Sequence, residues 1–142
     1  MLARMGLIKL YIRGKVMEKS ILEYLEHSAE AYPGKTAFED ETESCSYLEL
    51  KNKAKILGTL LSSKVEPGQA VPVFMDKSVK AVTCFMGAAY AGAFYVMLDP
   101  SQPASRLSYI LETLNAKMII GSAEYKEQLG RLGFHGEVLI FE

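Results

Sequence analysis

The stretch that decides the fold is GAAYAGAFYVMLDPSQPASRLSYIL, residues 87–111. It begins in a helical segment rich in glycine and alanine, small residues that let a helix lie close against a sheet. The apolar run 94–98, bounded by Gly92 and Asp99-Pro100, predicts a fully buried strand. Pro103 suits the first turn of the next helix, whose expected inward stripe is Leu107, Ile110, Leu111 and Leu114.

Toward the N-terminus, two capping boxes predict the starts of two helices. In Ser20-Ile-Leu-Glu23 and Ser46-Tyr-Leu-Glu49, the serine can accept a bond from a free N–H and the glutamate can reach back to the cap. The first helix is expected to end at Tyr32-Pro33-Gly34, and the second before Glu66-Pro67-Gly68. Two short strands, 36–39 and 44–47, are expected between them.

The remaining elements continue the alternation of strand and helix. Pro72 lies inside the predicted strand 70–75 and removes a ladder donor, which favours an edge position or a strand start for this residue. An apolar helix is predicted over 78–90. Two further strands, 117–120 and 137–141, are joined by a helix over about 123–132. This order predicts an α/β fold of doubly wound type, with a largely parallel sheet and helices on both faces.

Composition fits one globular domain. The 142 residues are 49% hydrophobic and 23% charged, with a formal net charge of −1, which argues against a nucleic-acid binder. Residues 1–16 carry four basic residues and no acid, and their apolar runs are too short for a membrane span. They are interpreted as an upstream-start extension, a basic targeting or membrane-surface leader being the alternative, with the domain proper over 17–142. Cytoplasmic localisation is expected, with no membrane partner.

Motifs that carry chemistry are missing from the sequence. Gly130, Gly133 and Gly136 fall between a helix and a strand, the reverse of the order that a phosphate-binding turn requires. The acidic run 39–41 is interpreted as a solvated turn. The remaining candidates, Cys45, Cys84, His27 and His135, have no metal-ligand spacing, and Cys84 is expected to act as a small hydrophobe. No catalytic, cofactor-binding or metal-binding residue is therefore predicted.

Two stretches resemble adenylate-forming enzymes, especially the adenylation domains of nonribosomal peptide synthetases and D-alanine–carrier-protein ligases. CSYLEL, residues 45–50, is similar to their "LTYxEL" element, and 87–111 is similar to "LKAGxAYVPLDPxxPxxRxxYIL". The intervening EPGQAVPVFMDKSVKAV is similar to "GDxVxIxxxxSxEMIVA". Departures from the pattern are Gln69, Tyr90, Phe94 and Met97.

The resemblance implies an AMP-dependent ligase that activates a carboxylate with ATP and magnesium and passes it to a carrier-protein phosphopantetheine. The family's glycine-rich phosphate loop would follow this region, and the sequence ends at Glu142 before it. The chain is thus expected to be an N-terminal subdomain without ATP-binding motifs, inactive alone. Arg106 is expected to pair with Asp99 or to bind carbonyls of the turn, a structural role. Alternatives are an interaction module, or one half of a split enzyme whose partner is the remainder of the domain. Self-association through an exposed apolar face is also expected.

Overall fold

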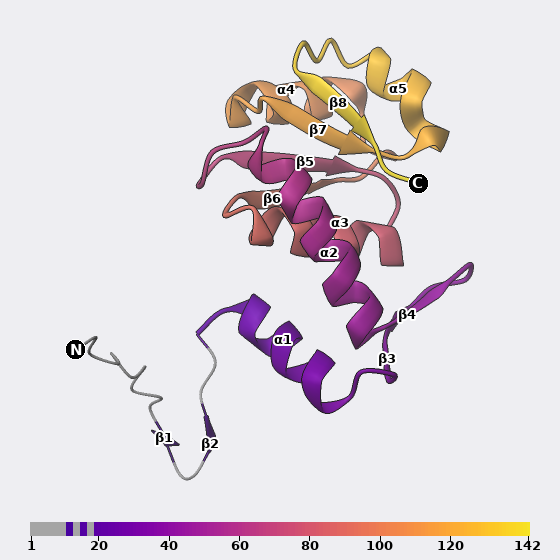
Figure 1. The fold of residues 1–142 in the computed structure, drawn as a ribbon. Helices are drawn as coiled ribbons and strands as arrows, with labels where there is room; N and C mark the ends of the chain where they lie inside the picture. Colours follow the sequence, from indigo (N-terminus) through magenta and orange to yellow (C-terminus); the bar gives the residue numbers. More distant parts are fainter. Residues whose placement is uncertain (1–10, 13–14, 17–18) are drawn as a thin grey trace, which may run out of the picture.

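The computed structural model describes residues 11–12, 15–16 and 19–142, and its centre is a four-stranded parallel sheet (Figure 1). The strand order is β6-β5-β7-β8, and every neighbouring pair is parallel. The strands are β5 (Ala70–Phe74), β6 (Phe94–Leu98), β7 (Met118–Gly121) and β8 (Glu137–Ile140). Most of the predicted leader lies outside the described residues; within it, β1 (Tyr11–Ile12) and β2 (Lys15–Val16) pair antiparallel.

Helices cover both faces of this sheet, as the sequence predicted. One face carries α2 (Tyr47–Ser62) and α3 (Val79–Tyr90), which bury Val71, Val73 and Ile120. The opposite face carries α4 (Ala104–Leu114) and α5 (Lys126–Gly130), the latter preceded by the 3-10 turn Ala123–Tyr125. This second core contains, among others, Phe74, Leu98, Leu107, Leu111 and Ile119. Alternate residues of a strand point to opposite faces, so neighbours such as Val73 and Phe74 belong to different cores.

The prediction that Pro72 marks an edge or a strand start is wrong, because β5 is an interior strand of the sheet. Its register with β6 runs over all five residues, whereas its register with β7 includes only Val73 and Phe74. The Phe74 carbonyl accepts from the Ser122 N–H on the β7 side, and alternation places Pro72, two residues earlier, on that same side. The missing donor therefore falls where β5 and β7 are not yet paired.

The strand 94–98 is present, but the prediction that it is fully buried is wrong. β6 lies at the edge of the sheet, so it is not the central element of the sheet, and Phe94 and Tyr95 are 48% and 42% exposed. Tyr95 stacks on Phe85 of α3, with ring centroids 4.2 Å apart. The continuous apolar run reflects contacts of this kind at a sheet edge, a pattern that sequence periodicity cannot distinguish from an interior strand.

Both predicted helix caps are present, although one is incomplete. Ser46 and Glu49 form a full capping box at the start of α2. At α1 (Ile21–Ala31) the Ser20 hydroxyl accepts from the Glu23 N–H at 3.3 Å. The Glu23 carboxylate, however, accepts from the N–H of Lys19 at 2.7 Å rather than from the cap residue.

Gly58 and Gly87 let α2 and α3 pack closely against each other, a helix–helix contact that the sequence pattern did not indicate. A Cβ added at Gly58 would lie 2.5 Å from the Cβ of Tyr90. A Cβ added at Gly87 would lie 2.8 Å from the side chain of Leu57. Real Cβ atoms do not approach this closely, so a side chain at either position would force its neighbour on the other helix to move.

The N-terminal elements form a third, smaller core beside α2 and α3. The strands β3 (Thr36–Glu39) and β4 (Ser44–Ser46) pair antiparallel, and the core includes Leu25, Cys45, Leu50 and Val79. No helix among the described residues is long and apolar enough to cross a membrane.

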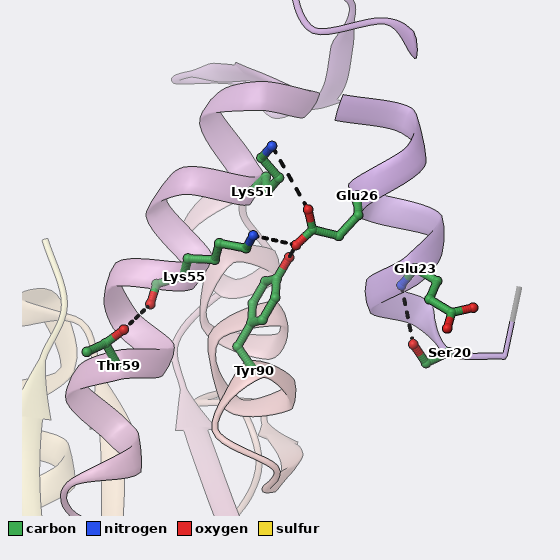
Figure 2. A network of polar contacts seen from close by, with 7 residues as sticks. All are labelled: Ser20, Glu23, Glu26, Lys51, Lys55, Thr59 and Tyr90. Carbon is green, nitrogen blue, oxygen red and sulfur yellow. Dashed lines mark hydrogen bonds and ion pairs between the residues drawn. The ribbon is translucent and has the colours of Figure 1, made fainter. Parts of the chain in front are cut away.

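A polar network ties α1 to this helix pair (Figure 2). The Glu26 carboxylate accepts from the Tyr90 hydroxyl at 2.7 Å and pairs with Lys55 at 2.6 Å and Lys51 at 4.0 Å. The Lys55 ammonium also lies 5.6 Å from the centroid of the Tyr90 ring. Bonds from Lys55 and Tyr90 lower the pKa of Glu26. Tyr90, a departure from the family pattern, therefore has a structural partner in α1.

Candidate functional site

The candidate site is the crevice at the carboxyl ends of β5 and β7. From β5 the chain crosses through α3 to β6 on one side, and from β6 it returns through α4 to β7 on the other side. The strand order therefore reverses between β5 and β7. In open α/β sheets, ligands bind outside the carboxyl ends of the strands at such a switch point.

A hollow of about 470 Å³ lies at this position. Three segments line it: the turn between β3 and β4 (residues 40–43), the loop that leaves β5 (residues 75–78), and the start of the connection after β7. Its charged residues are Asp40, Glu41, Glu43, Asp76 and Glu124, with Lys77 and Lys80. Acids outnumber bases, so the crevice disfavours an anionic ligand.

Asp40 occupies the position at the start of α3 that an anionic ligand would use. Its carboxylate accepts from the Val79 N–H at 2.8 Å, from the Thr42 N–H at 2.8 Å and from the Glu43 N–H at 2.9 Å. These bonds hold the pKa of Asp40 well below its ordinary value. Ser78 completes the cap by accepting from the Ala81 N–H at 3.1 Å. The free N–H groups of Val79 and Ala81 at this helix end are thus satisfied from within the chain.

Asp40 is the residue that sequence reasoning missed, because the acidic run 39–41 was interpreted as a solvated turn. Its partner Val79 is 39 positions away, so no local pattern shows the long-range bond. One local signal was available: the Asp40 carboxylate accepts both from the N–H and from the hydroxyl of Thr42, each at 2.8 Å. In such an Asx-turn the Asp side chain accepts from the backbone N–H two positions later, an arrangement that Asp favours in turns.

Next to the crevice, Tyr125 donates to the carboxylate of the lining residue Asp76 at 2.6 Å. This bond raises the pKa of Tyr125 to about 12, so its hydroxyl stays a neutral donor. The Ser122 hydroxyl oxygen is buried and has no hydrogen-bond partner. Chemically, the crevice offers carboxylate acceptors and hydroxyl groups, and no nucleophile lies beside a base among its described lining residues.

The remaining sequence candidates lie apart from this crevice. Both cysteines are buried, and burial raises the pKa of Cys84 to about 12, which confirms its role as a small apolar residue. Gly130, Gly133 and Gly136 lie at the end of α5 and in the connection to β8. In the part of the chain that the structure describes, no group of three His, Cys, Asp or Glu residues could hold a metal ion.

The predicted role of Arg106 is wrong. Asp99 accepts from the Ser101 N–H at 2.9 Å, and this contact with Ser101 lowers its pKa. The side chain of Arg106 is exposed and makes no ion pair with Asp99. A local turn closes around Asp99 without the arginine, because the Ser101 N–H lies two residues away and needs no long side chain to be fixed.

These observations test whether the described residues fit Mg-ATP, the cofactor of adenylate-forming enzymes. A triphosphate needs free N–H groups or basic side chains, whereas here Asp40 fills the α3 terminus and acids dominate the crevice. Among the described residues, no group of three His, Cys, Asp or Glu residues could hold a metal ion by itself. The acidic crevice therefore does not fit the phosphates of ATP.

Comparison with known proteins places the chain in a family. The family described as AMP-binding enzyme matches residues 25–138. Tyrocidine synthase 1 of Brevibacillus parabrevis is 33% identical over 125 residues, which are 87% of this chain and 12% of that protein.

Solved structures agree with this match. A variant of the nonribosomal peptide synthetase FmoA3 has a TM-score of 0.77 and 26% identity, over 84% of this chain and 13% of the other. A benzoate CoA ligase from Burkholderia xenovorans LB400 has a TM-score of 0.76 and 25% identity, over 85% of this chain and 25% of the other. The chain thus spans only a small part of each relative, and it corresponds to the N-terminal part of the adenylating region. It belongs to the family of AMP-binding enzymes.

Proposed function

We propose that residues 17–142 form the N-terminal subdomain of a ligase that activates an amino acid or another carboxylate. In the proposed reaction the carboxylate attacks the α-phosphorus of Mg-ATP, giving an acyl-adenylate and pyrophosphate. A carrier-protein phosphopantetheine thiol then accepts the acyl group and AMP is released. The observation that supports this proposal is the family match over residues 25–138, combined with relatives that include nonribosomal peptide synthetases.

The proposed contribution of this chain is structural. Its parallel sheet and two helical layers provide a rigid scaffold, while the start of α3 is already capped by Asp40 and the crevice is acidic. ATP and magnesium would be bound by the remainder of the adenylation domain, which is the principal proposed partner together with the carrier protein. The isolated chain would then be inactive. The two free cysteines fit the reducing cytoplasm, the proposed compartment.

The first test uses the isolated chain. ATP–pyrophosphate exchange is measured across amino acids and small carboxylates, and ATP is titrated calorimetrically into the same sample. We expect no exchange and no binding heat. ATP binding or exchange by the purified chain would overturn the structural role proposed here.

A second test asks whether the chain can supply the missing subdomain. Residues 17–142 replace the matching segment of the tyrocidine synthase 1 adenylation domain, which is 33% identical. The control lacks the segment altogether. We expect pyrophosphate exchange from the chimera and none from the control. A chimera that is folded by circular dichroism but inactive would favour the interaction-module alternative.

The split-enzyme alternative differs in where the remainder is encoded. If a neighbouring reading frame encodes the glycine-rich phosphate loop, mixing its product with this chain should restore exchange that neither piece shows alone. Restoration only by covalent fusion would favour a truncated ligase over two separately encoded halves.

A further inference from the structure

A second hollow lies on the α2–α3 side of the molecule and adjoins the crevice, since Glu43 and Lys80 line both. Its volume is about 400 Å³, and it is formed by α2, α3 and the C-terminal segment 139–142. We define this groove by its apolar residues, which are Ile56, Leu57, Leu60, Val79, Leu139, Ile140 and Phe141. The floor is formed by well-buried residues, since Leu57 and Val79 are 4% and 3% exposed.

The groove also has a large apolar residue that projects from it. Ile56 is 73% exposed and Leu60, one turn later on α2, is 42% exposed. A helix of a soluble protein normally turns its apolar residues toward the core and its polar residues outward. Here α2 has an apolar inner face, with Leu50, Leu57 and Leu61 buried, and a second apolar patch on its outside. A hollow and a protruding side chain therefore occur on the same surface.

The charges around the groove include both signs in equal number. Lys53, Lys80, Glu43 and Glu142 line it together with the apolar residues. Among the described residues, none of these four side chains takes part in an intrachain ion pair. Two lysines and two glutamates give the groove a formal charge of zero, so two copies of it would not repel each other. They can instead exchange lysine–glutamate pairs.

From this surface we infer that two copies of the chain associate through the groove, with Ile56 of each copy inserted into the groove of the other. A two-fold interface needs a patch that is complementary to itself, which requires a projection, a hollow and both signs of charge on one surface. The groove has all three. The inference concerns the isolated chain and does not depend on the proposed ligase function.

The experiment is sedimentation velocity and equilibrium on the full chain over a concentration series from about 1 to 200 μM, a range that covers weak dimers. We expect a reversible monomer–dimer equilibrium. Ile56→Glu should raise the dissociation constant at least about 30-fold, as expected for a central buried residue of an interface. The side chain is 73% exposed in the monomer, so the substitution should leave the fold intact, which circular dichroism checks.

Tyr109→Glu is the matched control. Tyr109 is 70% exposed and lies on α4, which covers the opposite face of the sheet. We expect its dissociation constant to equal that of the unsubstituted chain. Lys80→Glu tests the charges: it changes the formal charge of each groove from zero to −2 and should weaken the dimer about tenfold at low salt, with a smaller effect at high salt.

Three results would overturn the inference. The first is a monomer at every concentration. The second is a dimer that Ile56→Glu leaves unchanged. The third is a dimer that Tyr109→Glu disrupts, which would place the contact on the α4 face instead.

Discussion

The two faces of the parallel sheet are covered in different ways. On one face, α2 and α3 approach each other closely, because Gly58 and Gly87 in their contact leave no room for a Cβ. Under α4 and α5, bulky side chains fill the space, and Phe74 packs edge-to-face on Tyr125 with ring centroids 5.9 Å apart. The free energy of unfolding should therefore fall when a side chain is enlarged on the first face, and when a side chain is truncated on the second. Stability measurements can separate these two sensitivities.

The largest effect is expected on the side-chain-filled face. Phe74→Ala should lower the free energy of unfolding by about 3–5 kcal/mol, because Phe74 is 0% exposed and its loss leaves a cavity. Urea denaturation followed by circular dichroism measures the change. Phe94→Ala is the matched control, since Phe94 lies on the edge strand and is 48% exposed, and it should cost about 1 kcal/mol. Equal costs would mean that the two phenylalanines are similarly packed.

On the close-packed face, adding a single methyl group should be costly. Gly58→Ala should lower the free energy of unfolding by about 2 kcal/mol, since the steric conflict with Tyr90 outweighs the gain in helix propensity. Gly130→Ala is the control on α5, where nothing lies within 4 Å of the added Cβ. It should be neutral or slightly stabilising in the same urea experiment. A neutral Gly58→Ala would show that the helix pair can separate at little cost.

A smaller difference is expected between two tyrosine hydroxyls. Tyr90→Phe removes a part-buried hydrogen bond to Glu26 and should cost about 1–1.5 kcal/mol. Tyr125→Phe removes an exposed bond to Asp76 and should lower the stability less than Tyr90→Phe does. Thermal unfolding of both variants gives the comparison. A larger loss from Tyr125→Phe would indicate that the crevice wall stabilises the fold more than the α1 network does.

The smallest effect is a pH dependence of the α1 network. The folded pKa of Glu26 is lowered from its ordinary value of 4.5, mainly by its bond from Lys55. Its stabilising contribution should therefore be complete above pH 4.5 and be lost as the pH falls through the lower folded pKa. Glu26→Gln should cost about 0.5–1 kcal/mol at pH 7, a difference that shrinks in acid.

The measurement for this last prediction is urea denaturation of the Glu26→Gln variant and the unsubstituted chain at pH 7, 5, 4 and 3. Glu30→Gln, at an exposed position of the same helix, should show no difference at any pH. A difference between Glu26→Gln and the unsubstituted chain that grows toward acid would contradict the direction of the pKa shift.

Much of this architecture follows from local sequence. The serine caps at Ser20 and Ser46, and the alternation of strands and helices, predicted a parallel sheet with helices on both faces. These features depend on neighbours three or four residues apart, or on the spacing of apolar side chains, and a single chain shows both. The family resemblance at residues 87–111 likewise depends on consecutive residues, and the match over residues 25–138 confirms the family.

Only the tertiary structure showed how segments that are distant in the sequence contact one another. Pro72 is tolerated inside the sheet because β7 has not yet paired at that point. Phe94 is half exposed because β6 lies at an edge. Asp40 closes the start of α3 through a bond that spans 39 positions. Strand order and long-range bonds depend on which elements become neighbours after folding, and local periodicity contains no information about that choice.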